Sequence, residues 1–103
     1  MSISNEDELY NTISHDRQAD IIADVMAERF KQDKKWGEQN HDPVTFLAIL
    51  VEEVGELAEA ALHLKFGGPK AANVREEAVQ TAAVAIAILE CLDRDTWKVP
   101  SSE

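Results

Sequence analysis

The segment AVQTAAVAIAIL, from Ala78 to Leu89, is apolar around nearly the whole circumference that a helix would present. A helix of this kind must be covered on most of its sides. The chain has only 103 residues, so two further helices can hardly supply that cover. We therefore expect an all-α fold, an antiparallel helical bundle that is completed by homo-oligomerisation as a dimer or a tetramer. A monomer with a short N-terminal helix as a lid is the alternative.

Helical periodicity fills the chain between its few glycines and prolines, and no alternating run of β-branched residues predicts a strand. The pattern predicts helices over residues 14–32, 43–66 and 71–93. Ser14 is the expected N-cap of the first helix, and Asp42 followed by Pro43 predicts the start of the second. The glycine pair at 67–68 predicts its end. We expect a single domain over residues 1–103, with a core over about 14–93 and an irregular tail over 94–103.

Charge and composition limit the classes of partner. The formal net charge is -10, which argues against nucleic acid or an anionic membrane, because both require a basic face. No apolar run reaches the roughly 18 residues of a membrane span. The N-terminus MSISNEDELY lacks the apolar core of a signal peptide, and the single cysteine, Cys91, excludes an intramolecular disulfide. We therefore expect a cytoplasmic protein.

Four glutamates lie close together in the second predicted helix, in the stretch LVEEVGELAEAALHLKF. A helix turns by roughly 100° per residue, which places Glu52, Glu56 and Glu59 on one stripe, by default a solvated face. The stripe on the far side is apolar and is the predicted core face: Phe46, Leu50, Val54, Leu57, Ala61 and Leu64. Glu53 falls at the margin of the apolar face, one turn from Glu56, so both carboxylates can point to the same place.

The third predicted helix carries a second carboxylate on an apolar face. Glu77 lies on the same side as Thr81, Val84 and Ile88. Its neighbour Glu76 falls instead on a side that we predict to be more surface-like, together with Ala83, Ala87, Glu90 and Arg94.

A carboxylate at the edge of an apolar core must be paired with a cation or must bind a metal ion. Oxygen ligands from two helices favour Mg²⁺, with Mn²⁺ as the other candidate, over zinc. Such an ion would also allow an acidic protein to bind phosphates. The alternative is ion pairing of these acids with Arg29, Lys65 or Arg75.

The order of these acids resembles the all-α nucleoside triphosphate pyrophosphohydrolases of the MazG-like superfamily, whose signature is ExxE, a spacer and ExxD. Here the two halves are Glu53-Val54-Gly55-Glu56 and Glu77-Ala78-Val79-Gln80. The flanking text KWGEQNHDPVTFLAILVEEVGELAEA and REEAVQTAAVAIAILE is similar to short stand-alone members, over roughly residues 30–92. The resemblance implies Mg²⁺-dependent hydrolysis of (deoxy)nucleoside triphosphates to monophosphate and pyrophosphate, in nucleotide-pool house-cleaning, by a homo-oligomeric bundle.

The resemblance implies that Glu53, Glu56 and Glu77 are metal ligands, with Gln80 in the fourth place, where the family pattern has aspartate. A glutamine oxygen can coordinate a cation but carries no charge, so metal affinity should fall; otherwise a water fills the place and one fewer ion binds. The alternative function is therefore a non-catalytic or weakly active nucleotide-binding or structural oligomer.

Further residues could serve such a reaction. Glu52 is the candidate catalytic base, although its place on the helix is that of a solvated residue. Trp36, in the predicted loop beside Lys34 and Lys35, could stack on a nucleobase or could simply pack on the bundle. Asn73, one turn before Glu77, could also reach the site. Lys65, Lys70 or Arg75, near the ends of the second and third helices, could bind the phosphates, and the sequence does not select one of them.

Overall fold

The computed structural model describes residues 15–94, 96–98 and 100. Three long helices make up most of this part of the chain: α2 (His15–Trp36), α3 (Pro43–Phe66) and α4 (Val74–Asp93), the last preceded by the short 3₁₀ helix η1 (Ala71–Asn73). The described residues include no strand, so the all-α prediction is confirmed. None of the described helices is both long enough and apolar enough to cross a membrane. The predicted N-cap Ser14 lies outside the described residues.

Helix α3 begins and ends where the sequence predicts. The Asp42 carboxylate accepts hydrogen bonds from the backbone N–H of Thr45, at 3.0 Å, and from the Thr45 hydroxyl, at 2.7 Å. These bonds lower the pKa of Asp42 and satisfy a helix N–H that would otherwise have no partner. At the other end, Gly67 has a φ of 90° and donates its N–H to the His63 carbonyl at 2.8 Å. Only glycine adopts this φ without strain.

Helix α2 continues to Trp36, four residues beyond the predicted end at Gln32. It stops at Gly37, which has a φ of 73° and donates its N–H to the Asp33 carbonyl at 2.7 Å. Lysines in the last turn also suit the negative end of the helix dipole. The prediction that Trp36 lies in a loop was therefore wrong, and the side chains of this last turn are positioned by a helix.

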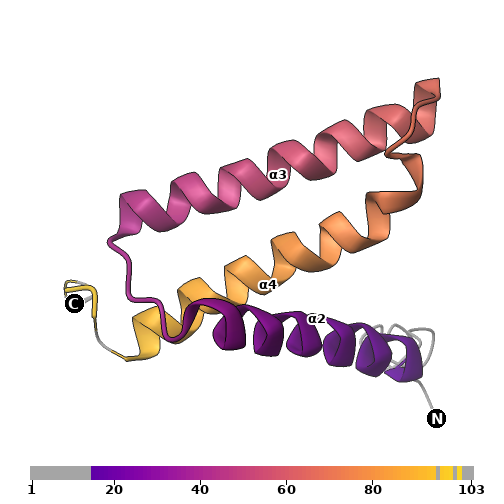
Figure 1. Cartoon of the computed structure of the whole chain (residues 1–103). Helices are drawn as coiled ribbons and strands as arrows, with labels where there is room; N and C mark the ends of the chain where they lie inside the picture. Colours follow the sequence, from indigo (N-terminus) through magenta and orange to yellow (C-terminus); the bar gives the residue numbers. More distant parts are fainter. Residues whose placement is uncertain (1–14, 95, 99, 101–103) are drawn as a thin grey trace, which may run out of the picture.

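Helix α4 lies between the other two and packs against both, with α3 antiparallel to it (Figure 1). Helices α2 and α3 do not approach each other closely. The radius of gyration is 17.5 Å, whereas a compact domain of this length has about 13 Å. The single chain is thus an open arrangement: α2 and α3 both pack on α4 and leave a gap between them.

One side of α4 that we predicted to be surface-like is covered. Ala83 is 0% exposed and Ala87 7% exposed. On the same side, Glu90 accepts a hydrogen bond from Arg29 of α2 at 2.8 Å. The prediction was wrong because α2 packs on this side, and periodicity within α4 alone does not show where a third helix will lie.

The buried face of α3 is also rotated from the predicted core stripe. Phe46 and Ala60 are buried, and Leu50 and Leu57 are half-buried. Three members of the predicted stripe are exposed: Val54, Ala61 and Leu64. In the single chain α3 can bury only the side that meets α4, so the half-buried Glu53 lies on the packed face and part of the apolar stripe stays outside.

The described part of the tail has no helix but is attached to the core. The indole N–H of Trp97 donates to the His41 carbonyl at 2.8 Å, and its ring lies 6.2 Å from that of Phe46. The Thr96 hydroxyl donates to the Cys91 carbonyl at 2.9 Å. The tail thereby covers the end of the α3–α4 pair at which Phe46 and Cys91 are fully buried.

Candidate metal centre

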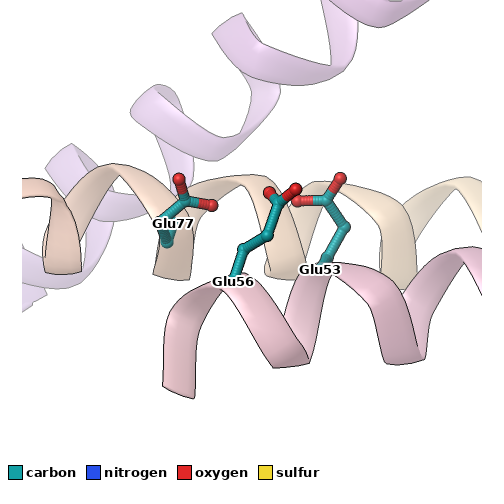
Figure 2. A group of neighbouring side chains, drawn as sticks. All are labelled: Glu53, Glu56 and Glu77. Atoms are coloured by element: carbon teal, nitrogen blue, oxygen red, sulfur yellow. The ribbon is translucent and has the colours of Figure 1, made fainter. Parts of the chain in front are cut away.

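Three glutamates from two helices converge at the junction of α3 and α4. Glu53 and Glu56 lie one turn apart on α3, and Glu77 lies in the first turn of α4. Each offers a carboxylate oxygen, and these oxygens lie within 4.8 Å of one another. Figure 2 shows the three side chains extending to the same side of the two helices, with their carboxylates grouped. We call Glu53, Glu56 and Glu77 the acidic cluster.

Two of these carboxylates are held in an unfavourable environment. The Oε2 atoms of Glu53 and Glu77 are buried and have no hydrogen-bond partner among the described residues. Burial raises the pKa of Glu53, and the charges of Glu56 and Glu77 raise it further. Burial and then the charge of Glu56 raise the pKa of Glu77. An ionised, unpaired carboxylate costs free energy in such a place, and a cation would remove that cost.

The cations named above as alternative partners are engaged elsewhere in the described part of the chain. Arg29 pairs with Asp33 and Glu90, each at 2.8 Å. Arg75 pairs with Asp24 at 2.7 Å, and Lys65 lies over the ring of Phe66, with Nζ 5.2 Å from its centroid. An all-oxygen donor set with two unpartnered buried atoms suits a divalent ion such as Mg²⁺ or Mn²⁺.

A cavity of about 550 Å³ opens on one side of the acidic cluster, in the gap between α2 and α3. Its two ends differ in chemistry. Where the early part of α4 meets the middle of α3, the lining residues are acidic or polar: Glu28, Glu52, Glu53, Glu76 and Gln80. Where α2 ends and α3 begins, they are Trp36, Gln39, Phe46 and Ala87, and between the two ends lie Lys31, Gln32, Lys35, Ile49 and Val84. An elongated ligand would therefore meet carboxylates at one end and the exposed ring of Trp36 at the other.

A smaller hollow of about 190 Å³ lies on the other side of the cluster. It is lined by Glu56 and Glu77 together with Ala60, Lys70 and Asn73. Lys70 also pairs with Glu59, and this ion pair raises the pKa of Lys70. The acidic cluster thus stands between two spaces, with Glu53 facing the large one and Glu56 and Glu77 facing the small one.

The remaining predicted site residues fall into three groups. Glu52, Gln80, Lys35 and Trp36 line the large cavity, and Lys35 places its Nζ 4.6 Å from the centroid of the Trp36 ring. Asn73 lines the small hollow. Two others lie outside both spaces: Lys34, which is exposed in the last turn of α2, and Arg75, which faces Asp24.

The large cavity also contains residues that the sequence reasoning missed. Helix α2 contributes Glu28, Lys31 and Gln32, and α4 contributes Glu76. The charge of Glu28 adds to the rise in the pKa of Glu53 that burial begins. The signal was a polar stripe at spacings of three and four along α2, from Glu28 through Lys31 and Gln32 to Lys35. This stripe could have indicated that one face of α2 lines a polar cavity, but it could not have shown which helices form the other walls.

No protein-family model, no curated protein and no solved structure matches this chain. What the site can do therefore follows from its geometry: it offers oxygen ligands to a divalent cation beside a cavity with an aromatic end.

Proposed function

We propose that this protein is a Mg²⁺-dependent nucleoside triphosphate pyrophosphohydrolase of the MazG-like type. On this proposal it acts as a cytoplasmic homo-oligomer in the clearance of nucleotides, and it releases a nucleoside monophosphate and pyrophosphate. The observation that carries the proposal is the acidic cluster, whose oxygens from two helices lie within 4.8 Å of one another and include two buried atoms without partners. Burial of ionised oxygens without partners costs free energy, and a bound cation would remove that cost.

The large cavity supports a nucleotide as the ligand. Ligand sites of small molecules are typically about 300–1,000 Å³, and this cavity has about 550 Å³. Phosphates would bind through Mg²⁺ at the acidic end, and the base would lie against the exposed ring of Trp36 at the other. Lys31 and Lys35 line the wall between the two ends and would contribute positive charge to the phosphate chain.

Hydrolysis of a phosphoanhydride requires neutralised phosphates and a water in line with the leaving group. Mg²⁺, when bound, would supply charge neutralisation and would lower the pKa of a coordinated water. Glu53, Glu56 and Glu77 would hold the ion, with Gln80 as an uncharged fourth ligand. Glu52 lines the same end of the cavity and would accept the proton of the attacking water.

A second function remains in competition because Gln80 lines the cavity where the family pattern has an acid. An amide contributes less to cation binding than a carboxylate does. The competing function is a nucleotide-binding or structural oligomer with little or no turnover. Nucleotide binding without pyrophosphate release would favour it.

The deciding experiment measures pyrophosphate release from a panel of ribo- and deoxynucleoside triphosphates, with and without Mg²⁺. We expect Mg²⁺-dependent release by the wild type and a loss of roughly 100-fold or more in Glu53→Gln, because a metal ligand is removed. Asp20→Asn, which removes an exposed carboxylate on α2, is the control and should keep wild-type activity. Absence of Mg²⁺-dependent release by the wild type from every nucleotide would overturn the enzymatic proposal.

A further inference from the structure

A buried arginine organises the wall of the large cavity that α2 forms. Arg29 is 7% exposed, and its guanidinium uses three nitrogens. Nε donates to Glu90 at 2.8 Å, Nη2 to Asp33 at 2.8 Å and Nη1 to the Oε1 atom of Gln32 at 3.0 Å. Burial acts to lower the pKa of Arg29, but its bonds to Glu90 and Asp33 outweigh burial and raise it. Arg29 is thus a permanent cation with a fixed set of acceptors.

The contact with Arg29 determines which end of the Gln32 amide a ligand can meet. A guanidinium has donors and no acceptor, so the atom of Gln32 that faces it must be the carbonyl oxygen. The oxygen keeps a second lone pair, but it is turned towards the buried guanidinium. The amide –NH₂ is therefore the end that remains for a ligand, and it can only donate. Gln32 lines the large cavity between the acidic end and the Trp36 end.

We propose that Gln32 is a specificity-determining residue that selects nucleobases carrying a carbonyl oxygen where others carry an amino group. This inference rests on the proposed function, because it assigns the base edge that the cavity recognises. The Gln32 –NH₂ donates to O4 of uracil or thymine, or to O6 of guanine or hypoxanthine. The N4 amino group of cytosine and the N6 amino group of adenine are themselves donors, so neither can accept a hydrogen bond from the Gln32 –NH₂.

The orientation of Gln32 also removes the usual way in which glutamine reads adenine. A free glutamine contacts adenine with both ends of its amide, the oxygen accepting from N6 and the nitrogen donating to N7. In this protein the oxygen is held by Arg29. An unpaired polar group in a binding cavity costs more than the missing bond alone, so discrimination against the amino bases should be about tenfold or more.

The test uses pairs of bases that differ at this one position. Binding of the non-hydrolysable α,β-imido triphosphates of deoxyuridine and deoxycytidine is measured by titration calorimetry in the presence of Mg²⁺. The wild type should bind the uracil analogue about tenfold more tightly than the cytosine analogue. The corresponding hypoxanthine and adenine analogues should show the same order.

Two variants at position 32 test whether the hydrogen-bonding groups of the Gln32 amide cause the base preference. Gln32→Leu should bring the uracil and cytosine affinities within about twofold of each other, because neither donor nor acceptor remains. Gln32→Glu keeps an oxygen for Arg29 and places an acceptor in the cavity, so the preference should move towards cytosine. Gln18→Glu, an exposed change on the same helix with the same added charge, should keep the wild-type preference.

The outcomes also separate this inference from the proposed function. Equal affinities of the wild type for uracil and cytosine, or a preference that Gln32→Leu leaves intact, would overturn the role of Gln32 and leave the metal-dependent hydrolysis standing. Failure of every analogue to bind would overturn both. The wild-type comparison decides the matter even if a variant does not fold, and far-ultraviolet circular dichroism reports the folding of each variant.

Discussion

Glu53 and Glu77 are side chains of the acidic cluster whose protonation is linked to folding. Burial, followed by neighbouring carboxylates, raises both pKa values above the ordinary 4.5 of glutamate. The stabilising contribution of a group with a raised folded-state pKa is fully present below its unfolded-state pKa, and it is lost as the pH rises through the folded-state pKa. The pair therefore destabilises the metal-free fold at neutral pH.

This linkage predicts how stability changes with pH in the presence of EDTA. As the pH falls from neutral towards 4.5, the wild type should gain thermal stability relative to the double variant Glu53→Gln/Glu77→Gln. The double variant should unfold at a higher temperature than the wild type at neutral pH, and the difference should shrink in acid. Thermal unfolding followed by circular dichroism across this range measures it.

Mg²⁺ provides the control for that prediction. At neutral pH it should raise the unfolding temperature of the wild type and leave that of the double variant unchanged, because the ligand carboxylates are missing there. Asp42 and Glu59 have lowered pKa values. Their contributions to stability are therefore present above the ordinary carboxyl pKa, and they are lost as the pH falls through the lowered values. A wild type that is more stable than the double variant at neutral pH without metal would contradict the prediction.

Gln80 is the residue at which the metal site can be strengthened. Gln80→Asp adds a charge to the cavity wall that Glu53 also lines, and it should tighten Mg²⁺ binding by about tenfold or more, because affinity for a hard cation depends on the number of charged ligands. Isothermal titration with Mg²⁺ measures the change. Gln18→Asp, on the exposed side of α2, controls for net charge. An unchanged affinity in Gln80→Asp would place residue 80 outside the coordination sphere.

At the level of elements, α2 is joined to α4 in the described part of the chain by ion pairs that differ in burial. Arg29 is buried and bonds to Glu90, whereas Arg75 and Asp24 form an exposed pair. An exposed pair contributes little, because water and salt screen both charges. Removal of Arg29 also loses its contacts with Asp33 and Gln32. The attachment of α2 should therefore depend mainly on the buried pair.

We expect Arg29→Ala to lower the free energy of unfolding by about 2 kcal/mol, since partly exposed carboxylates can be rehydrated once the guanidinium is gone. Arg75→Ala should cost less than about 1 kcal/mol. Urea unfolding of the two variants makes the comparison. Equal losses of unfolding free energy in the two variants would show that burial does not determine how strongly an ion pair holds α2 to α4.

Local signals in the sequence were sufficient to predict the helices, but not to predict which faces of the helices pack together. The bounds of α3 follow from Asp42, Pro43 and Gly67, whose effects are confined to a turn or less. The carboxylates of Glu53, Glu56 and Glu77 were expected to meet, and the structure brings them together. The side of α4 that α2 covers, and hence Glu28 and Gln32 in the cavity, depends on long-range packing that no single periodicity encodes. Gly37 was a local signal that the prediction overlooked.

On the scale of the whole molecule, the single chain leaves much apolar surface uncovered. On α3 the exposed side chains include Leu47, Val51 and Val54, at 58%, 58% and 47% exposure. On α2, Ile22 and Phe30 are 62% and 72% exposed. Uncovered apolar surface on this scale is typical of an interface. This exposure supports the proposed homo-oligomer, in which a second copy would cover the outer side of α3.

Val51→Glu tests the interface. A charge in the centre of the exposed face of α3 should convert the oligomer to monomers and lower the unfolding temperature, because covered apolar area is lost. Sedimentation equilibrium gives the mass of the assembly. Gln18→Glu adds the same charge at an exposed polar position and should leave the mass unchanged. A wild type that sediments as a monomer at all concentrations would contradict the proposed assembly.

The chain contains two tryptophans, and the fold gives them different surroundings. Trp36 is 57% exposed at the aromatic end of the large cavity, whereas Trp97 is tied to His41 behind Phe46. The protein therefore carries its own optical probe: fluorescence quenching by a stacked base should come from the first indole, while the second supplies a steady background. Nucleotide binding could then be followed by intrinsic fluorescence without an added dye, and Trp36→Phe should show no fluorescence change on titration.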